Sequence, residues 1–91
     1  MKNEFADVPE TCRMAMAAAA EKPGRYGGRY VARRYDRVNR RTDWMVLGDD
    51  DPELYKNDEA IDIVAQVTPT KVLPIGRARA WLNEDGSVNL D

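Results

Sequence analysis

The amino-acid sequence predicts an α+β fold in which one N-terminal helix packs on a mostly antiparallel sheet of four or five strands. An alanine-rich stretch with apolar residues at helical spacing comes first and ends at Pro23-Gly24. Several runs rich in β-branched and aromatic residues follow, separated by polar turn sequences. Together these patterns indicate one helix followed by strands.

The helix is expected over residues 8–22. Asp7 and Glu10 have the spacing of a capping box, and Pro9 is tolerated in the first turn because its missing amide hydrogen would be unpaired there. The side chains at helical spacing that predict the buried face are Val8, Cys12, Ala15 and Ala19, with Met16 beside them. Such small residues allow a helix to lie close to a sheet.

A basic hairpin is expected over residues 29–48. The run from Tyr30 to Val38 is rich in strand-forming residues, and 39–42 is a plausible connection to a second strand over 43–48. Apolar residues on both faces of this second strand suit a central position in the sheet.

An acidic loop is expected over residues 49–62, followed by strands and a hairpin over about 60–90. Residues 60–67 fit both helical and strand spacing, but their β-branched content and Pro69 favour a strand. Residues 77–82 and 87–90 are expected to pair around the turn sequence Asn83-Glu84-Asp85-Gly86.

Length and composition predict a single domain over residues 1–91. The chain has 91 residues, of which 43% are hydrophobic, and a domain of this size has a thin core with little room for an enclosed pocket. We expect Trp44 and Trp81 in this core. With no apolar stretch long enough to span a bilayer or to form a signal core, we expect a cytoplasmic protein that does not engage membranes.

The residue types present argue against catalysis. There is one cysteine, Cys12, and no histidine, so an internal disulfide, a zinc site and Ser-His or Cys-His chemistry are excluded within one chain. We therefore expect a non-enzymatic protein with no cofactor, no metal and no small-molecule substrate.

The net charge of −2 hides a strong segregation of charge along the chain. Residues 13–41 carry nine Lys or Arg and two acids, a net +7, and eight of the nine cations are arginines. Residues 42–66 carry eight acids and one lysine, a net −7. Such adjacent blocks either neutralise each other across strands or present a basic and an acidic face to a partner.

The basic block predicts a partner-binding surface. Arginines alternate along the first strand around Tyr35, an arrangement that can follow phosphates and offer a ring for stacking, and arginine suits bidentate phosphate contacts. The alternative is a solvated sheet face. The predicted partner-binding residues are Arg25, Tyr26, Arg29, Arg33, Arg34, Tyr35, Arg37, Arg40 and Arg41.

The acidic block predicts a second possible contact. An EF-hand loop starting at Asp49 is excluded, because Leu54 stands where glycine is needed and Ala60 where the last acid is needed. The remaining interpretations are a solvated loop and a mimic of nucleic-acid phosphates that docks on a basic groove. The candidate mimic residues are Asp49, Asp50, Asp51 and Glu53.

In size and charge style the chain resembles the small phage-encoded anti-CRISPR proteins. The features that carry the resemblance are the basic Arg/Tyr strand, Tyr30 to Arg41, the acidic segment, Asp49 to Asp62, and the absence of histidine. It implies a non-enzymatic inhibitor of a type I surveillance complex, with type I-F as the candidate subtype, that docks on the Cas protein and guide RNA assembly and blocks target DNA. The alternatives are a small nucleic-acid-binding accessory or regulatory protein and an ordinary subunit of a larger complex.

Overall fold

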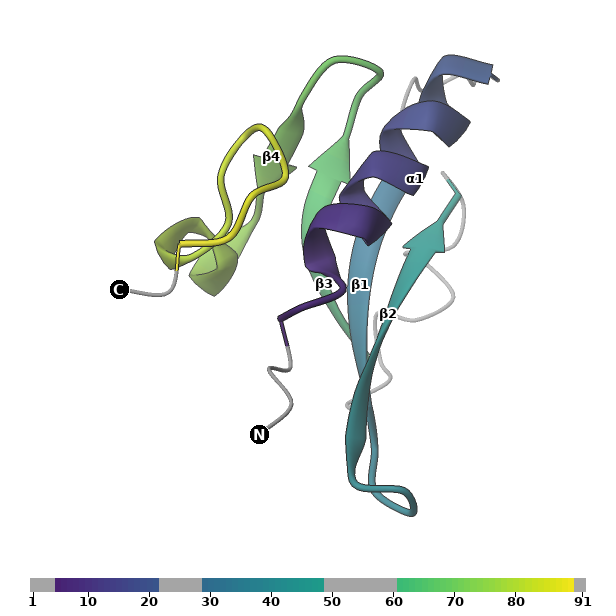
Figure 1. Cartoon of the computed structure of the whole chain (residues 1–91), viewed down its shortest axis with the longest axis vertical. Helices are drawn as coiled ribbons and strands as arrows, with labels where there is room; N and C mark the ends of the chain where they lie inside the picture. Colours follow the sequence, from purple (N-terminus) through teal and green to yellow (C-terminus); the bar gives the residue numbers. More distant parts are fainter. Residues whose placement is uncertain (1–4, 22–28, 49–60, 90–91) are drawn as a thin grey trace.

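The computed structural model describes residues 5–21, 29–48 and 61–89, which form two layers, a helix and a sheet (Figure 1). The helix α1 (Val8–Glu21) lies on one face of an antiparallel sheet. Its strands are β1 (Arg29–Asp36), β2 (Arg41–Leu47), β3 (Ile61–Val67) and β4 (Val72–Pro74), and the 3₁₀ helix η1 (Gly76–Ala80) follows β4. The predicted α+β class, a helix on a four-stranded antiparallel sheet, is confirmed.

The strand order is β2-β1-β3-β4, so β1 and β3 are central and β2 is an edge strand. The predicted hairpin over residues 29–48 is confirmed, but its turn lies at 37–40 and not at 39–42, because β2 begins at Arg41. The central position expected for β2 was also wrong. Both faces of β2 are apolar because the side chains on each face pack against side chains on the same face of β1. Val46 lies opposite Val31 on one face, and Met45 lies opposite Ala32 on the other.

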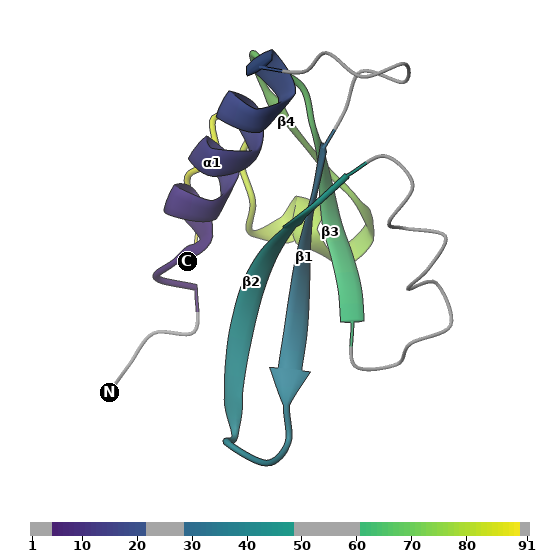
Figure 2. The ribbon, with the colours of Figure 1, turned by 90° about the vertical axis from the view of Figure 1, so that its right-hand side faces the viewer.

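Small side chains bring α1 close to the sheet (Figure 2). The predicted stripe is confirmed, since its four members are at most 1% exposed and Thr11 is buried beside them. The Asp7–Glu10 capping box is not formed among the described residues. Glu10 instead pairs with Arg13 one turn along, and the backbone carbonyl of Asp7 accepts hydrogen bonds from both the backbone N–H and the hydroxyl of Thr11.

Three aromatic rings extend the core between the helix start and the sheet. The ring of Trp81 lies 4.8 Å from that of Phe5 and 5.9 Å from that of Trp44, measured between centroids. Both tryptophans are only partly buried and pack against the outside of the core. The core position expected for them is therefore confirmed only in part.

The C-terminal segment departs most from the sequence-based expectation. Residues 76–80 form η1, not a strand, and the expected hairpin is reduced to one bridge between Leu82 and Val88 around a turn at 83–86. The strand β4 was not predicted at all. Residues 77–82 were expected in a strand because they precede the turn sequence at 83–86, but that turn is also compatible with a 3₁₀ helix before it, which here buries Ala78 to 3% exposure.

Candidate functional site

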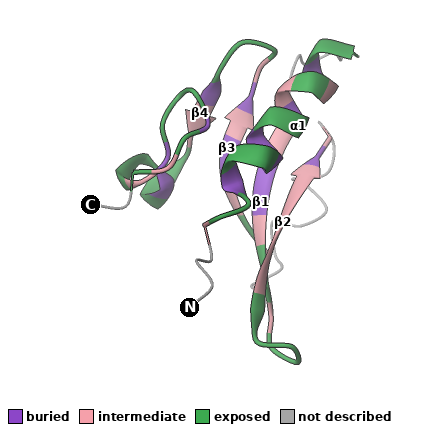
Figure 3. Cartoon of the chain, in the orientation of Figure 1, coloured by how far each residue is buried: buried purple, intermediate pink, exposed green. Residues whose placement is uncertain are grey.

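The β1–β2 hairpin extends well beyond the helix and the rest of the fold, as both ribbon views show (Figures 1 and 2). We call residues 33–44 the hairpin arm. This arm contains five arginines and two aspartates, and its outer part is largely exposed (Figure 3). A positively charged projection is therefore held by two paired strands of the sheet.

The exposure of β1 changes along the strand and not from face to face. Val31 and Ala32 point to opposite faces, yet both are 0% exposed. Farther along, Arg34 is exposed and Tyr35 is 50% exposed, again on opposite faces. Each face of β1 therefore carries both apolar and charged residues, because one end of the strand is buried and the other end belongs to the arm.

Asp36 holds the turn at the end of the arm. One of its carboxylate oxygens accepts hydrogen bonds from the backbone N–H groups of Val38 and Asn39, at 3.0 and 3.2 Å, and the other accepts from the Asn39 side chain at 2.8 Å. These hydrogen bonds lower the pKa of Asp36, and the hydrogen bond from the Asn39 side chain makes the largest contribution. The carboxylate is thus occupied by the turn.

The arginines of the arm differ in their partners. Asp43 lies 3.7 Å from Arg34 and 3.3 Å from Arg41, so one carboxylate is shared by two guanidinium groups. Arg37 and Arg40, which lie in the exposed turn, form no ion pair with any residue that the structure describes. Their positive charge is available to a partner.

Arg33 is the arginine of the arm that the fold holds most firmly. Its Nη2 atom donates a 3.1 Å hydrogen bond to Asp62 Oδ2, and its guanidinium carbon lies 5.9 Å from the centroid of the Trp44 ring. Two interactions thus fix a side chain that is one-third exposed.

A β-bulge in β3 produces the Arg33–Asp62 pair. Val31 pairs with Ala65 but Ala32 pairs with Ile63, so Val64 is an extra residue in β3. In uninterrupted pairing Arg33 would face Ile63. The bulge places Asp62 opposite Arg33 instead, on the face of the sheet that carries α1.

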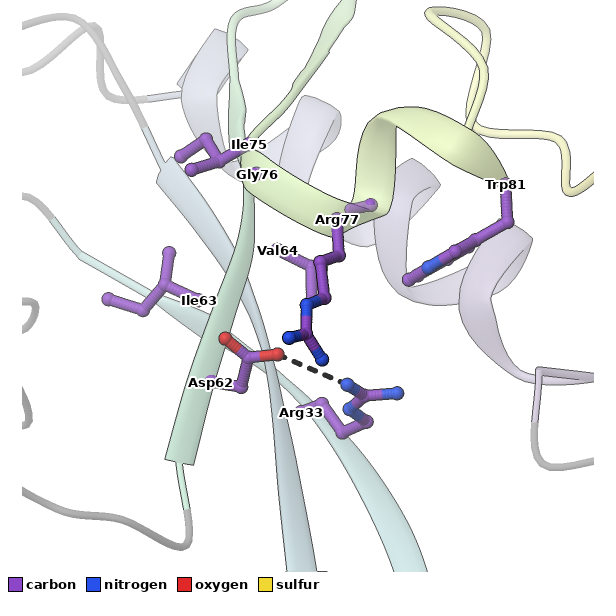
Figure 4. Close-up of a pocket in the computed structure, with 9 residues that line it drawn as sticks. Arg33, Asp62, Ile63, Val64, Ile75, Gly76, Arg77 and Trp81 are labelled. Carbon is purple, nitrogen blue, oxygen red and sulfur yellow. Dashed lines mark hydrogen bonds and ion pairs between the residues drawn. The ribbon is translucent and has the colours of Figure 1, made fainter.

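Beside this pair a pocket of about 340 Å³ lies between β3 and η1 (Figure 4). Arg77 and Trp81 line it together with Arg33 and Asp62. Sequence reasoning missed this site, because Arg77 was expected in a strand, Trp81 in the core and Asp62 in a loop. The bulge and the turn into η1 bring the three together, and no local pattern indicates either.

The other predicted site residues are placed as follows. Arg29 begins β1, is half-buried and lies opposite Val67 of β3. Arg25, Tyr26 and the four acids proposed as phosphate mimics, Asp49, Asp50, Asp51 and Glu53, lie outside the described residues. Their roles stay predictions.

The described residues offer neither a metal-binding cluster nor a membrane-spanning helix. Within residues 5–21, 29–48 and 61–89, no three His, Cys, Asp or Glu side chains are grouped so as to hold a metal ion. No helix in the same segments has the length and apolar character to cross a membrane.

Comparison with protein-family models, with curated protein sequences and with solved structures finds no match to this chain. The site therefore has to be interpreted from its own geometry.

Proposed function

We propose that the protein is a non-enzymatic binding protein whose hairpin arm docks on a nucleic-acid-bearing partner. The observation that supports this most is the exposed turn of the arm, where Arg37 and Arg40 lack ion-pair partners among the described residues and Val38 is 91% exposed. Guanidinium groups form bidentate hydrogen bonds with phosphate, which is how arginines position a protein on nucleic acid.

The architecture of the arm favours a role in partner binding over the alternative that it is only a solvated surface. Its arginines are carried on paired strands and on a turn closed by Asp36, so less conformational entropy is lost when they contact a partner. Tyr35 adds an exposed ring for stacking on the same strand.

The partner in this proposal is a Cas protein and guide RNA complex of type I, with inhibition of target DNA binding in the host cytoplasm as the outcome. The support for this partner is the resemblance in size and charge style to small phage-encoded anti-CRISPR proteins. The alternative is direct binding of free DNA or RNA by the same arginines.

The test compares a double variant, Arg37→Ala with Arg40→Ala, with a charge-matched control, Arg13→Ala with Arg79→Ala, whose residues lie on α1 and η1. Binding to a purified type I-F complex, its uptake of labelled target DNA, and binding to free DNA and RNA oligonucleotides are measured at several salt concentrations. We expect the arm variant to lose roughly tenfold affinity for each arginine removed and about one unit of salt slope per lost phosphate contact.

The control variant should bind like the wild type. Equal losses from the two variants would show that only net charge matters and would contradict the proposal. Tight binding to free oligonucleotides without effect on the complex would establish the alternative. Both variants should fold, since exposed substitutions usually change stability by only about 0.5 kcal/mol.

A further inference from the structure

The pocket between β3 and η1 is a second candidate binding site, separate from the exposed turn of the arm. Its polar groups come from three elements: Arg33 from β1, Asp62 from β3 and Arg77 from η1. Figure 4 shows the hydrogen bond between Arg33 and the Asp62 carboxylate, with the Arg77 side chain entering the same pocket from η1. The apolar lining includes Ile63, Val64 and Ile75. A cavity of about 340 Å³ is within the range of small-ligand sites, roughly 300–1,000 Å³.

Hydrogen-bonding capacity in this pocket is only partly used. Asp62 Oδ2 accepts from Arg33, whereas Oδ1 has no hydrogen-bond partner among the described residues. Arg77 forms no ion pair within those same residues. The ring of Trp81, with its indole nitrogen, extends toward Arg77 in Figure 4. The pocket therefore presents a free Oδ1, an Oδ2 atom with capacity for a second hydrogen bond, and several open donors.

The Asp62 carboxylate decides which ligand chemistry fits. A bare phosphate or carboxylate would gain from both arginines but would be repelled by the aspartate beside them. A ligand that presents donors to Asp62 and acceptors to Arg77 uses both charges, and a flat ring suits the apolar lining. Nucleobases have this combination, and guanine has it most fully. Its N1–H and N2–H₂ groups donate along one edge, and its O6 and N7 atoms accept from arginine.

We propose that this pocket binds an unpaired guanine, with Asp62 accepting from N1–H and N2–H₂ and Arg77 donating to O6 and N7. The proposal rests on the proposed function, because the guanine belongs to the nucleic acid of the partner. Arg33 acts as a positioning residue that holds the carboxylate through its 3.1 Å hydrogen bond.

Guanosine monophosphate itself is the first probe, because its binding to the pocket does not need the arm. The signal is the indole N–H resonance of Trp81, assigned with a Trp44→Phe variant. We expect guanosine monophosphate to shift it saturably and inosine monophosphate, which lacks N2–H₂, to bind at least about fivefold more weakly. Adenosine monophosphate and inorganic phosphate should leave it unchanged. An equal shift from phosphate alone, or no shift with millimolar guanosine monophosphate, would overturn the proposal.

Protein variants then locate the contacts. Asp62→Asn should remove the preference for guanosine over inosine, and Arg77→Ala should weaken guanosine binding. The matched control is Arg79→Ala, which removes an η1 arginine that does not line the pocket. Similar losses from Arg77→Ala and Arg79→Ala would count against a specific site.

The variant with Arg37 and Arg40 replaced by alanine separates this proposal from that of the arm. This variant should no longer bind the partner but should still bind guanosine monophosphate. Partner binding lost in the arm variant together with no guanine response would leave the proposed function standing and refute the pocket. A guanine response together with undiminished partner binding by the arm variant would refute the arm and retain the pocket.

Discussion

At the scale of single residues, Asp36 shows how one carboxylate serves the structure of the basic arm. It closes the turn by accepting from two backbone N–H groups and from the Asn39 side chain. Asp36 forms no ion pair with an arginine among the described residues, although the charge of Arg41 contributes to lowering its pKa. The turn is thus held in place while Arg37 and Arg40 stay available.

We expect Asp36→Ala to destabilise the protein at neutral pH. Because hydrogen bonding lowers the pKa of Asp36 in the folded state, its contribution is present above the unfolded pKa and is lost as pH falls through the lower folded pKa. The difference in unfolding free energy between wild type and variant should therefore shrink below about pH 4. Urea titrations at several pH values measure it.

The control for this experiment is Glu84→Ala, because the Glu84 side chain forms no hydrogen bond with the described residues. Its effect should be small. A difference between wild type and Asp36→Ala that persists unchanged in acid would show that the ionised carboxylate is not what stabilises the turn.

Cys12 is the buried thiol of the helix stripe, and burial raises its pKa to about 11. For a group whose folded pKa is raised above its unfolded value, stability is fully present below the unfolded pKa and is lost as pH rises. Between about pH 9 and 11 the unfolding free energy should fall by up to about 1.4 kcal/mol per pH unit from this group. Cys12→Ala should lack that component, which the difference between the two pH–stability curves isolates. Parallel curves would contradict it.

At the scale of elements, the turn at 83–86 packs against α1 through a glycine. Gly86 has φ of +88°, and a Cβ atom added there would lie 3.0 Å from the Cβ atom of Cys12. The turn and the helix therefore lie closer together than a side chain at position 86 would allow. This contact joins the C-terminal segment to the helix across the core.

We expect Gly86→Ala to destabilise the protein by more than about 1 kcal/mol, because backbone strain at positive φ and the close approach to Cys12 add together. Gly76→Ala is the matched control, since its φ of +59° imposes strain but no atom lies within 4 Å of the added Cβ. Thermal and urea unfolding of the two variants measure the difference. Equal losses would indicate that strain alone matters and that the turn can move away from the helix.

At the scale of the whole molecule, the fold separates a buried half from a projecting half. The core lies where α1 covers the sheet, whereas the hairpin arm extends past the helix, with four of its five arginines exposed. Figure 3 shows the exposed outer part of the arm. The pocket between β3 and η1 lies where these halves meet, since Arg33 belongs to the arm and Trp81 packs against the core. Under our proposals, one partner strand contacts both.

The local features of this protein could be predicted from its sequence. The helix from Val8, its buried stripe and the β1–β2 hairpin follow from spacing and turn chemistry over a few residues. The choice of strand over helix at residues 61–67 was also correct, because β-branched residues suit a sheet. These features depend on contacts between near neighbours, which the order of residues carries directly.

Long-range contacts, which the sequence does not reveal, set the edge position of β2, the strand β4, the helix η1 and the pocket. Each depends on which distant segments meet: Ile75 donates its N–H to the Val64 carbonyl, and the extra residue Val64 brings Asp62 opposite Arg33. One added residue reverses the face to which every later side chain of a strand points. Such a shift is selected by packing across the sheet, and the local sequence of β3 does not reveal it.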